Sequence, residues 1–196
     1  MNDKHDHEPK EYSDVTQKTT EVAFQRAIIN KGSSILRGRR VSWIDIELPV
    51  DNTGRARGKC IDLIGEDDAG WYVLCELKFR RKSRDNGGPA EAGKQLKDYV
   101  ELLGENLATF KMHQGKMFDK KKFANGRFRL VVAANREYWR SWFSARKRDK
   151  QELIDGIQYY EVEVDQFEFD HQKEKAGTKI YSPILPESGV RWKERN

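Results

Sequence analysis

The sequence predicts an α/β domain in which helices flank a mixed β-sheet. Stretches in which apolar residues alternate along the chain are interleaved with stretches in which they recur at helical spacing. Their order is one helix, three strands, a helix, a strand, a helix and a strand, which is typical of a mixed sheet with helices packed on it. With 196 residues, the chain is long enough to bury a sizeable core in one domain.

We expect the chain to begin with a flexible polar segment, residues 1–13, and to continue with a helix over residues 14–30. This helix carries an apolar stripe that includes Phe24 and Ile28, and Gly32 is a suitable stop.

Three strands are expected next, over residues 41–48, 59–65 and 71–79. The second and third strands are separated by only the turn-forming residues 66–70, so they should form an antiparallel hairpin. The third strand is apolar on both faces, which predicts a central position with both sides of the sheet covered.

The second half of the chain should add two helices and two strands. Pro89 suits the first turn of a helix that ends near Gly104. We expect a basic loop over 111–127, a strand over 127–134, an amphipathic helix over 136–154 and a strand over 157–164. The domain should therefore span residues 14–170, followed by an extended C-terminal tail, residues 171–196.

The composition excludes several classes of protein. Cys60 and Cys75 cannot form a disulfide framework or a four-thiolate metal site, and both lie in apolar runs that suit small core residues. No apolar run approaches the roughly 18 residues of a membrane span. The polar N-terminus lacks the apolar segment of a signal peptide, so the expected location is cytoplasmic.

The candidate chemistry lies on the predicted hairpin. Glu76 and Lys78 are two residues apart on one strand and therefore point to the same face. The turn places residues near 60–63 opposite residues near 73–76, so Asp62 can approach Glu76 closely enough to share one cation.

Ionised carboxylates in apolar strands are costly to bury unless they are paired or bind a metal. Mg²⁺, or Mn²⁺ in its place, suits Asp62 and Glu76 because it prefers oxygen ligands and keeps several waters. Such a metal could activate a water and neutralise charge on a scissile phosphate. Lys78 could position or deprotonate that water, or stabilise the charge of the transition state. The alternative is a plain ion pair between Lys78 and a carboxylate inside the sheet.

Asp62 followed by Glu76-Leu77-Lys78 resembles the motif of the PD-(D/E)xK nuclease superfamily, and the element order is similar to its restriction-endonuclease-like fold. Gln95 and Tyr99 resemble the Gln-x-x-x-Tyr motif of the RecB-like branch. The resemblance covers roughly residues 14–134.

The resemblance implies that the main-chain carbonyl of Leu77 also binds the metal, and that Glu21 on the first helix lies beside the metal site. It also implies that Gln95 acts at the site and that Tyr99 contacts nucleic acid. Two alternatives stay open: Tyr99 could belong to the apolar core of its helix, and Glu21 could be an ordinary solvated residue. Ile61 stands where many members have proline, and the iron–sulfur cysteines of Cas4-like proteins are absent.

Basic residues flank both strands of the hairpin and could contact phosphates, which predicts salt-sensitive binding. They are Arg55, Arg57 and Lys59 before Asp62, and Arg80, Arg81, Lys82 and Arg84 after Lys78. The aromatic residues within 138–148 could stack on single-stranded bases, although packing on the sheet is the simpler interpretation.

The sequence therefore favours a Mg²⁺- or Mn²⁺-dependent nuclease that hydrolyses phosphodiester bonds, with DNA as the expected substrate and repair or defence as the expected role. The alternative is a non-catalytic nucleic-acid-binding or assembly module on the same fold. Because nothing in the sequence supplies target recognition, a homodimer or a partner subunit is also conceivable.

Overall fold

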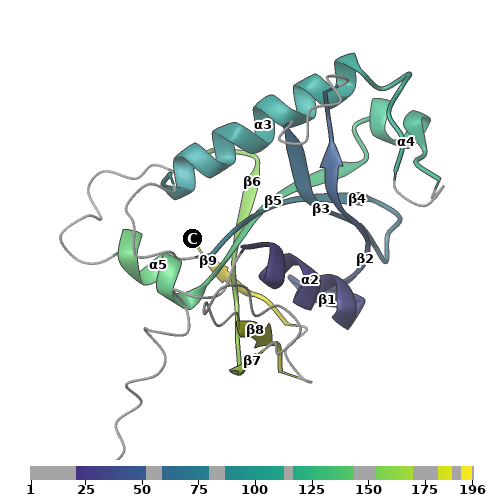
Figure 1. Cartoon of the computed structure of the whole chain (residues 1–196). Helices are drawn as coiled ribbons and strands as arrows, with labels where there is room; N and C mark the ends of the chain where they lie inside the picture. The colour runs from purple at the N-terminus through teal and green to yellow at the C-terminus, as the bar shows by residue number, and fades with distance from the viewer. Residues whose placement is uncertain are drawn as a thin grey trace, which may run out of the picture.

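The architecture was established from a computed structural model of the chain (Figure 1). It describes seven stretches: 21–51, 59–79, 87–112, 117–143, 153–169, 181–186 and 191–195.

Four helices lie within these stretches: α2 (Glu21–Lys31), α3 (Pro89–Glu105), α4 (Lys120–Ala124) and α5 (Arg136–Trp142). The strands of the main sheet are β1 (Ser33–Leu36), β2 (Arg39–Pro49), β3 (Cys60–Asp67), β4 (Tyr72–Lys78), β5 (Phe128–Asn135), β6 (Ile157–Val162) and β9 (Lys193–Arg195). A separate two-stranded ribbon is formed by β7 (Gln166–Phe169) and β8 (Tyr181–Ile184).

The seven strands of the main sheet follow the spatial order β1-β2-β3-β4-β5-β6-β9. The pairs β1–β2, β2–β3 and β3–β4 are antiparallel, the pairs β4–β5 and β5–β6 are parallel, and β9 pairs antiparallel with β6. The mixed sheet that the sequence predicts is therefore confirmed, and β4 lies at its centre, where every residue except Lys78 is buried.

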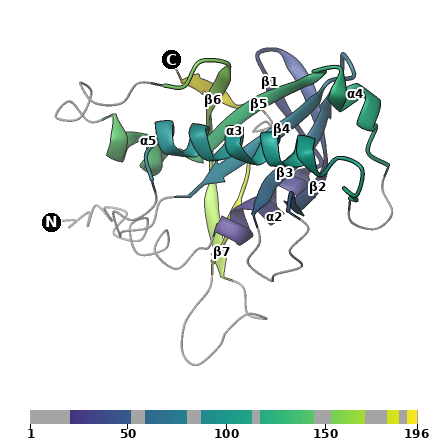
Figure 2. The same cartoon turned by 90° about the horizontal axis from the view of Figure 1, so that it is seen from above.

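Helices cover both faces of the sheet, as Figures 1 and 2 show for α2 on one side and α3 on the other. On the α2 face, Phe24 and Ile28 belong to a core with Val73 and Leu77. The opposite, α3 face has its own core, in which residues of α3 and α5 pack on even-numbered residues of β4 and β5. Since neighbouring residues of a strand point to opposite faces, β4 contributes to both cores.

All five strands predicted from the sequence are present as β2 to β6. The hairpin of β3 and β4 is antiparallel, with Leu63 opposite Cys75 and Gly65 opposite Val73, which confirms the expected register. Cys75 is fully buried and Cys60 partly buried, and both are free thiols.

The prediction of a long helix over 136–154 is wrong in its length. In the described residues, α5 ends at Trp142, and Leu153 and Ile154 are not helical. The Ile154 N–H donates to the hydroxyl of Tyr159 on β6, 3.0 Å away.

Short elements were not predicted. The four-residue β1 pairs with β2 through a two-residue turn, Arg37–Gly38, in which both φ angles are positive. Within the expected loop 111–127, Asp119 caps the five-residue α4 by accepting a hydrogen bond from the N–H of Lys122. Elements this short show too little periodicity to be recognised from apolar spacing.

The expected C-terminal tail contains parts of the fold. β9 adds to the edge of the main sheet beside β6, and Trp192 stacks on Trp43 with ring centroids 5.2 Å apart. The expected flexible segment 1–13 lies outside the described residues, as do the first seven residues of the helix expected over 14–30. No helix in the described stretches is long and apolar enough to cross a membrane.

We expect Gly65→Ala to destabilise the fold by about 1–3 kcal/mol, because β2 lies against the Cα of Gly65. An added Cβ would lie 2.7 Å from Val41 Cγ1 and 2.9 Å from the main-chain oxygen of Ser42. Urea denaturation measures the effect. The matched control is Gly104→Ala near the end of α3, where an added Cβ meets nothing within 4 Å and should stabilise the helix. Equal behaviour of the two variants would contradict the close approach.

Candidate metal-dependent active site

The candidate site lies where β3 and β4 separate. The pairing of the two strands ends at Leu63 and Cys75, and one further step along the same register places Asp62 opposite Glu76. β4 continues to pair with β5 as far as Lys78. The two carboxylates therefore lie where β3 and β4 diverge, near the C-terminal end of β4. We call this point the fork.

A local break in the sheet accompanies this fork. On β2, Ile46 packs toward the α2 face and Leu48 toward the α3 face, and their partners Leu63 and Ile61 on β3 differ in the same way. Residues two apart in a regular strand point to one face, so the strands must turn between these pairs. Glu47, which lies in the turn, has a φ of 49°. A left-handed conformation costs a non-glycine residue about 1 kcal/mol, and such strain is concentrated at functional sites.

Both oxygens of Asp62 accept hydrogen bonds from the protein. The side-chain amide of Gln25 donates to Oδ1, and the main-chain N–H of Leu77 donates to Oδ2, each over 2.7 Å. Gln25 lies on α2 and is only 3% exposed. The carboxylate is therefore held in one orientation by a helix on one side and by the neighbouring strand on the other.

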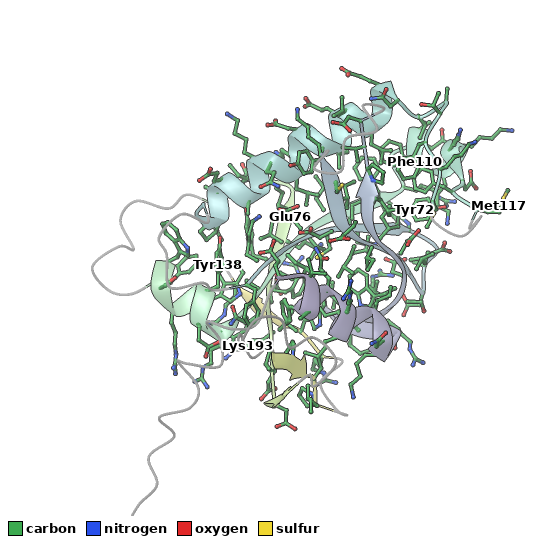
Figure 3. The ribbon with its side chains drawn as sticks, in the orientation of Figure 1. Tyr72, Glu76, Phe110, Met117, Tyr138 and Lys193 are labelled. Atoms are coloured by element: carbon green, nitrogen blue, oxygen red, sulfur yellow. The ribbon has the colours of Figure 1, made fainter. Side chains whose placement is uncertain are left out.

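Glu76 and Lys78 form a close ion pair, as their shared face predicts. Lys78 Nζ lies 2.6 Å from Oε1 of Glu76, which is only 2% exposed. The second carboxylate oxygen, Oε2, is buried and has no hydrogen-bond partner. Figure 3 shows Glu76 beneath α3, where the helix covers it.

The two residues of the Gln-x-x-x-Tyr pair extend the site from α3. Gln95 Oε1 lies 3.5 Å from Lys78 Nζ, and its amide donates to the hydroxyl of Tyr99 over 3.1 Å. Tyr99 also packs on the core of the α3 face. Its ring therefore contributes to the core while its hydroxyl contacts Gln95 at the site.

Glu21 joins the site from α2. Its Oε2 accepts a hydrogen bond from the main-chain N–H of Phe79, 3.2 Å away, directly after β4. Glu21 is one turn before Gln25 on the same face of the helix, and that spacing is the signal by which Gln25 could have been assigned to the site. Sequence analysis gave Gln25 no role.

The electrostatics reflect three carboxylates around one ammonium group. Burial, together with the charges of Glu76 and Glu21, raises the pKa of Asp62 well above its ordinary value. Burial also raises the pKa of Glu76, although Lys78 opposes this. Burial would lower the pKa of Lys78, but the neighbouring carboxylates outweigh it and raise that pKa. The site therefore holds excess negative charge that a cation would neutralise.

These groups fit a divalent metal in part. The unpartnered Oε2 of Glu76 is a hard oxygen ligand that can only accept, and Asp62 is fixed beside it. Within the described stretches, however, no group of three or more His, Cys, Asp or Glu side chains is placed to hold a metal ion. A metal here would depend on two carboxylates, a main-chain carbonyl such as that of Leu77, and water.

Most of the expected phosphate-binding residues lie outside the described stretches. These are Arg55, Arg57, Arg80, Arg81, Lys82 and Arg84. Lys59 is described, and its side chain is exposed just before β3.

The aromatic residues of α5 favour the simpler interpretation of residues 138–148. Tyr138 and Trp139 are buried, and Trp142 and Phe143 pack against the same core of the α3 face. These side chains therefore pack on the sheet, as the simpler interpretation predicts.

Comparisons with known proteins place the chain in no group: no family model, curated protein or solved structure matches it.

We expect the stability of the metal-free protein to depend on pH through Asp62. Because its pKa is raised in the folded state, the folded chain keeps a proton that the unfolded chain loses above about pH 4. Stability should therefore fall as pH rises through the window up to the raised pKa. Asp62→Asn removes this titration, so its stability relative to wild type should improve from pH 4 to pH 8.

Urea denaturation at the two pH values measures this difference. Asp98→Asn, an exposed position on α3, is the control and should follow wild type. An Asp62→Asn variant with the same pH dependence as wild type would contradict the raised pKa.

Proposed function

We propose that this chain is a metal-dependent nuclease that hydrolyses phosphodiester bonds, most readily in DNA, and acts in nucleic-acid repair or defence. The observation that carries the proposal is the buried, unpartnered Oε2 of Glu76, held beside a fixed Asp62 at the fork of two strands. A buried carboxylate oxygen without a hydrogen-bond donor is energetically costly unless it binds a cation or a proton. The resemblance of Asp62, Glu76, Leu77 and Lys78 to the PD-(D/E)xK motif supports the same conclusion.

Each residue has a role in this proposal that follows from its contacts. Asp62 and Glu76 bind the cation, together with the carbonyl of Leu77, and Gln25 keeps Asp62 in the binding orientation. The cation, Mg²⁺ or Mn²⁺, would lower the pKa of a bound water and neutralise phosphate charge. Glu21 adds a third negative charge on the α2 side of the site.

Lys78 and Gln95 act on the reacting groups. Lys78 is paired to Glu76 Oε1, and with a cation on that carboxylate its ammonium group would be available to an attacking water or a phosphate oxygen. Gln95 sets its position from α3, and Tyr99 holds the amide of Gln95. The Lys59 side chain and the basic segments around the hairpin would contact the backbone of the nucleic acid.

The alternative function is a non-catalytic nucleic-acid-binding or assembly module. The observation that favours it is the Glu76–Lys78 ion pair, which already satisfies half of the Glu76 carboxylate without any metal. In that case the charges would be structural, and the protein would bind nucleic acid without cleaving it.

Cleavage of a substrate panel separates the two functions. We expect purified protein to cleave supercoiled, linear or single-stranded DNA with Mg²⁺ or Mn²⁺ and to be inactive in EDTA, and RNA completes the panel. Asp62→Asn, Glu76→Gln and Lys78→Met should each lower the rate about 100-fold or more, because each removes a metal ligand or the ammonium group.

Asp98→Asn is the control and should keep full activity, since its side chain is exposed on α3. Thermal unfolding confirms that each variant is folded. Metal-dependent cleavage that survives Asp62→Asn or Glu76→Gln would reject the assigned site. Nucleic-acid binding without cleavage or metal binding would favour the alternative module.

We expect Gln25→Leu to weaken Mn²⁺ binding about 10- to 100-fold while the protein stays folded. The change keeps most of the side-chain volume but removes the donor to Asp62. Groups that hydrogen-bond to a metal ligand typically contribute this much to metal affinity. Calorimetric titration with Mn²⁺ measures the effect. Arg26→Leu, an exposed change at the next residue, serves as the control. Unchanged affinity in Gln25→Leu would show that Asp62 does not need this support.

A further inference from the structure

A pocket of about 310 Å³ opens on the α2 face of the sheet, at the end opposite the candidate site. Its floor is apolar and buried, and consists of Leu36, Val41, Val73 and Val131. The volume is at the lower end of the range for small-ligand pockets, so the pocket suits a single small molecule and not a polymer.

The pocket is separate from the candidate active site. Val73, at the start of β4, lies three and five residues before Glu76 and Lys78, which is roughly 10–16 Å along the strand. Odd- and even-numbered residues of β4 point to opposite faces, so Glu76 and Lys78 lie on the other side of the sheet from Val73. Glu21 and Gln25 reach the site from α2, near the C-terminal end of β4 and away from Val73.

Hydrogen-bond donors dominate the rim of the pocket. Arg37 lies in the turn after β1, Arg39 is the first residue of β2, and Arg129 comes from β5. Gln158 on β6 also lines the pocket, and its side-chain oxygen accepts from the hydroxyl of Tyr160. The amide oxygen of Gln158 is therefore engaged by Tyr160, and its NH₂ group can donate a hydrogen bond to a ligand.

The charge of the lining is positive. Among the lining residues, three guanidinium groups face one carboxylate, Asp67, and the carboxylates that pair with Arg37 and Arg39 do not line the pocket. Asp67 pairs with Arg129 Nε at 2.9 Å and also accepts the N–H of Trp71. Despite burial, these bonds lower the pKa of Asp67, so it stays ionised and serves to hold Arg129.

Arg37 and Arg39 can exchange their present partners for a ligand. Arg37 pairs with Glu194, and Arg39 lies 3.7 Å from Asp68. The side chains of both arginines are about half exposed, at 53% and 49%. Exposed ion pairs of this kind contribute about 0–1 kcal/mol, so they oppose a bound anion only weakly.

We propose that this pocket binds a phosphomonoester of mononucleotide size, with its phosphate against the arginines and its base on the apolar floor. A phosphomonoester carries a charge of about −1.5 to −2 at pH 7 and would take the place of Glu194 and Asp68 as the partner of Arg37 and Arg39. Guanidinium groups bind phosphate through paired, charge-assisted hydrogen bonds. The leucine and valines of the floor are at most 5% exposed, so they offer a small apolar surface for one edge of a ring system. The proposal does not depend on the proposed nuclease activity.

The test is calorimetric titration of the full chain with AMP, inorganic phosphate and adenosine in parallel. We expect saturable binding of AMP, weaker binding of phosphate, which lacks the apolar contact, and the weakest binding of adenosine. The double variant Arg37→Ala/Arg39→Ala should weaken AMP binding at least tenfold. The matched control is Arg40→Ala, the exposed neighbour whose guanidinium bonds Ser33 Oγ and does not line the pocket.

Three results would overturn the proposal: no saturable binding of AMP to folded protein, equal losses in Arg40→Ala and in the double variant, or adenosine or phosphate binding as tightly as AMP. If the double variant does not fold, Arg39→Ala alone provides the same test, because its ion pair is exposed. In that case a loss of AMP affinity supports the site and an unchanged affinity rejects it.

Discussion

The hydrogen bonds to the carboxylate of Asp62 are the contacts on which the rest of the candidate site depends. They join three parts of the chain: Gln25 on α2, Asp62 on β3 and the main chain at Leu77 on β4. Because the Leu77 N–H donates to a side chain beyond the last paired residues of the hairpin, β3 and β4 separate at this point. The fork leaves room for Glu76, Lys78 and Gln95 to meet beneath α3. Without it, the two strands would continue as a regular hairpin with an apolar surface.

The unfavourable free energy of this arrangement comes from a few groups. Glu76 is buried with one oxygen unpartnered, and Glu47 adopts a left-handed conformation opposite the fork. The pKa of Asp62 is raised by burial and by its acidic neighbours. A site selected only for stability would pair or remove such groups, since buried polar atoms normally have partners. Strain and unpaired charge in one place are typical of a binding or catalytic site, and a divalent cation would neutralise the unpaired charge.

Much of this region could be predicted from the sequence because its information is local. The alternating residues of β2, β3 and β4 identified the strands, and the short turn at 66–70 determined the register that brings Asp62 toward Glu76. Glu76 and Lys78 share a face by strand geometry alone. The spacing of Gln95 and Tyr99 on α3 likewise predicts their contact.

What the sequence could not reveal depends on packing between distant segments. Gln25 is 37 residues from Asp62, and only the seating of α2 on the sheet brings them together. The turn of the strand at Glu47 depends on the pairing of β2 with β3, and no residue type in the sequence indicates it. The end of α5 at Trp142 was missed because charged residues continue the helical pattern after the packed aromatic residues stop. β9 was missed because it is short and pairs at the sheet edge.

The central claim is that Asp62 and Glu76 bind one divalent cation between them. Anomalous X-ray diffraction from crystals soaked in Mn²⁺ tests it directly, because the signal locates the ion independently of activity. The account predicts an anomalous peak within bonding distance of Asp62, of Glu76 Oε2 and of the carbonyl of Leu77, with Lys78 still beside the site. A well-ordered site with no peak there, or with Mn²⁺ bound only elsewhere, would contradict it.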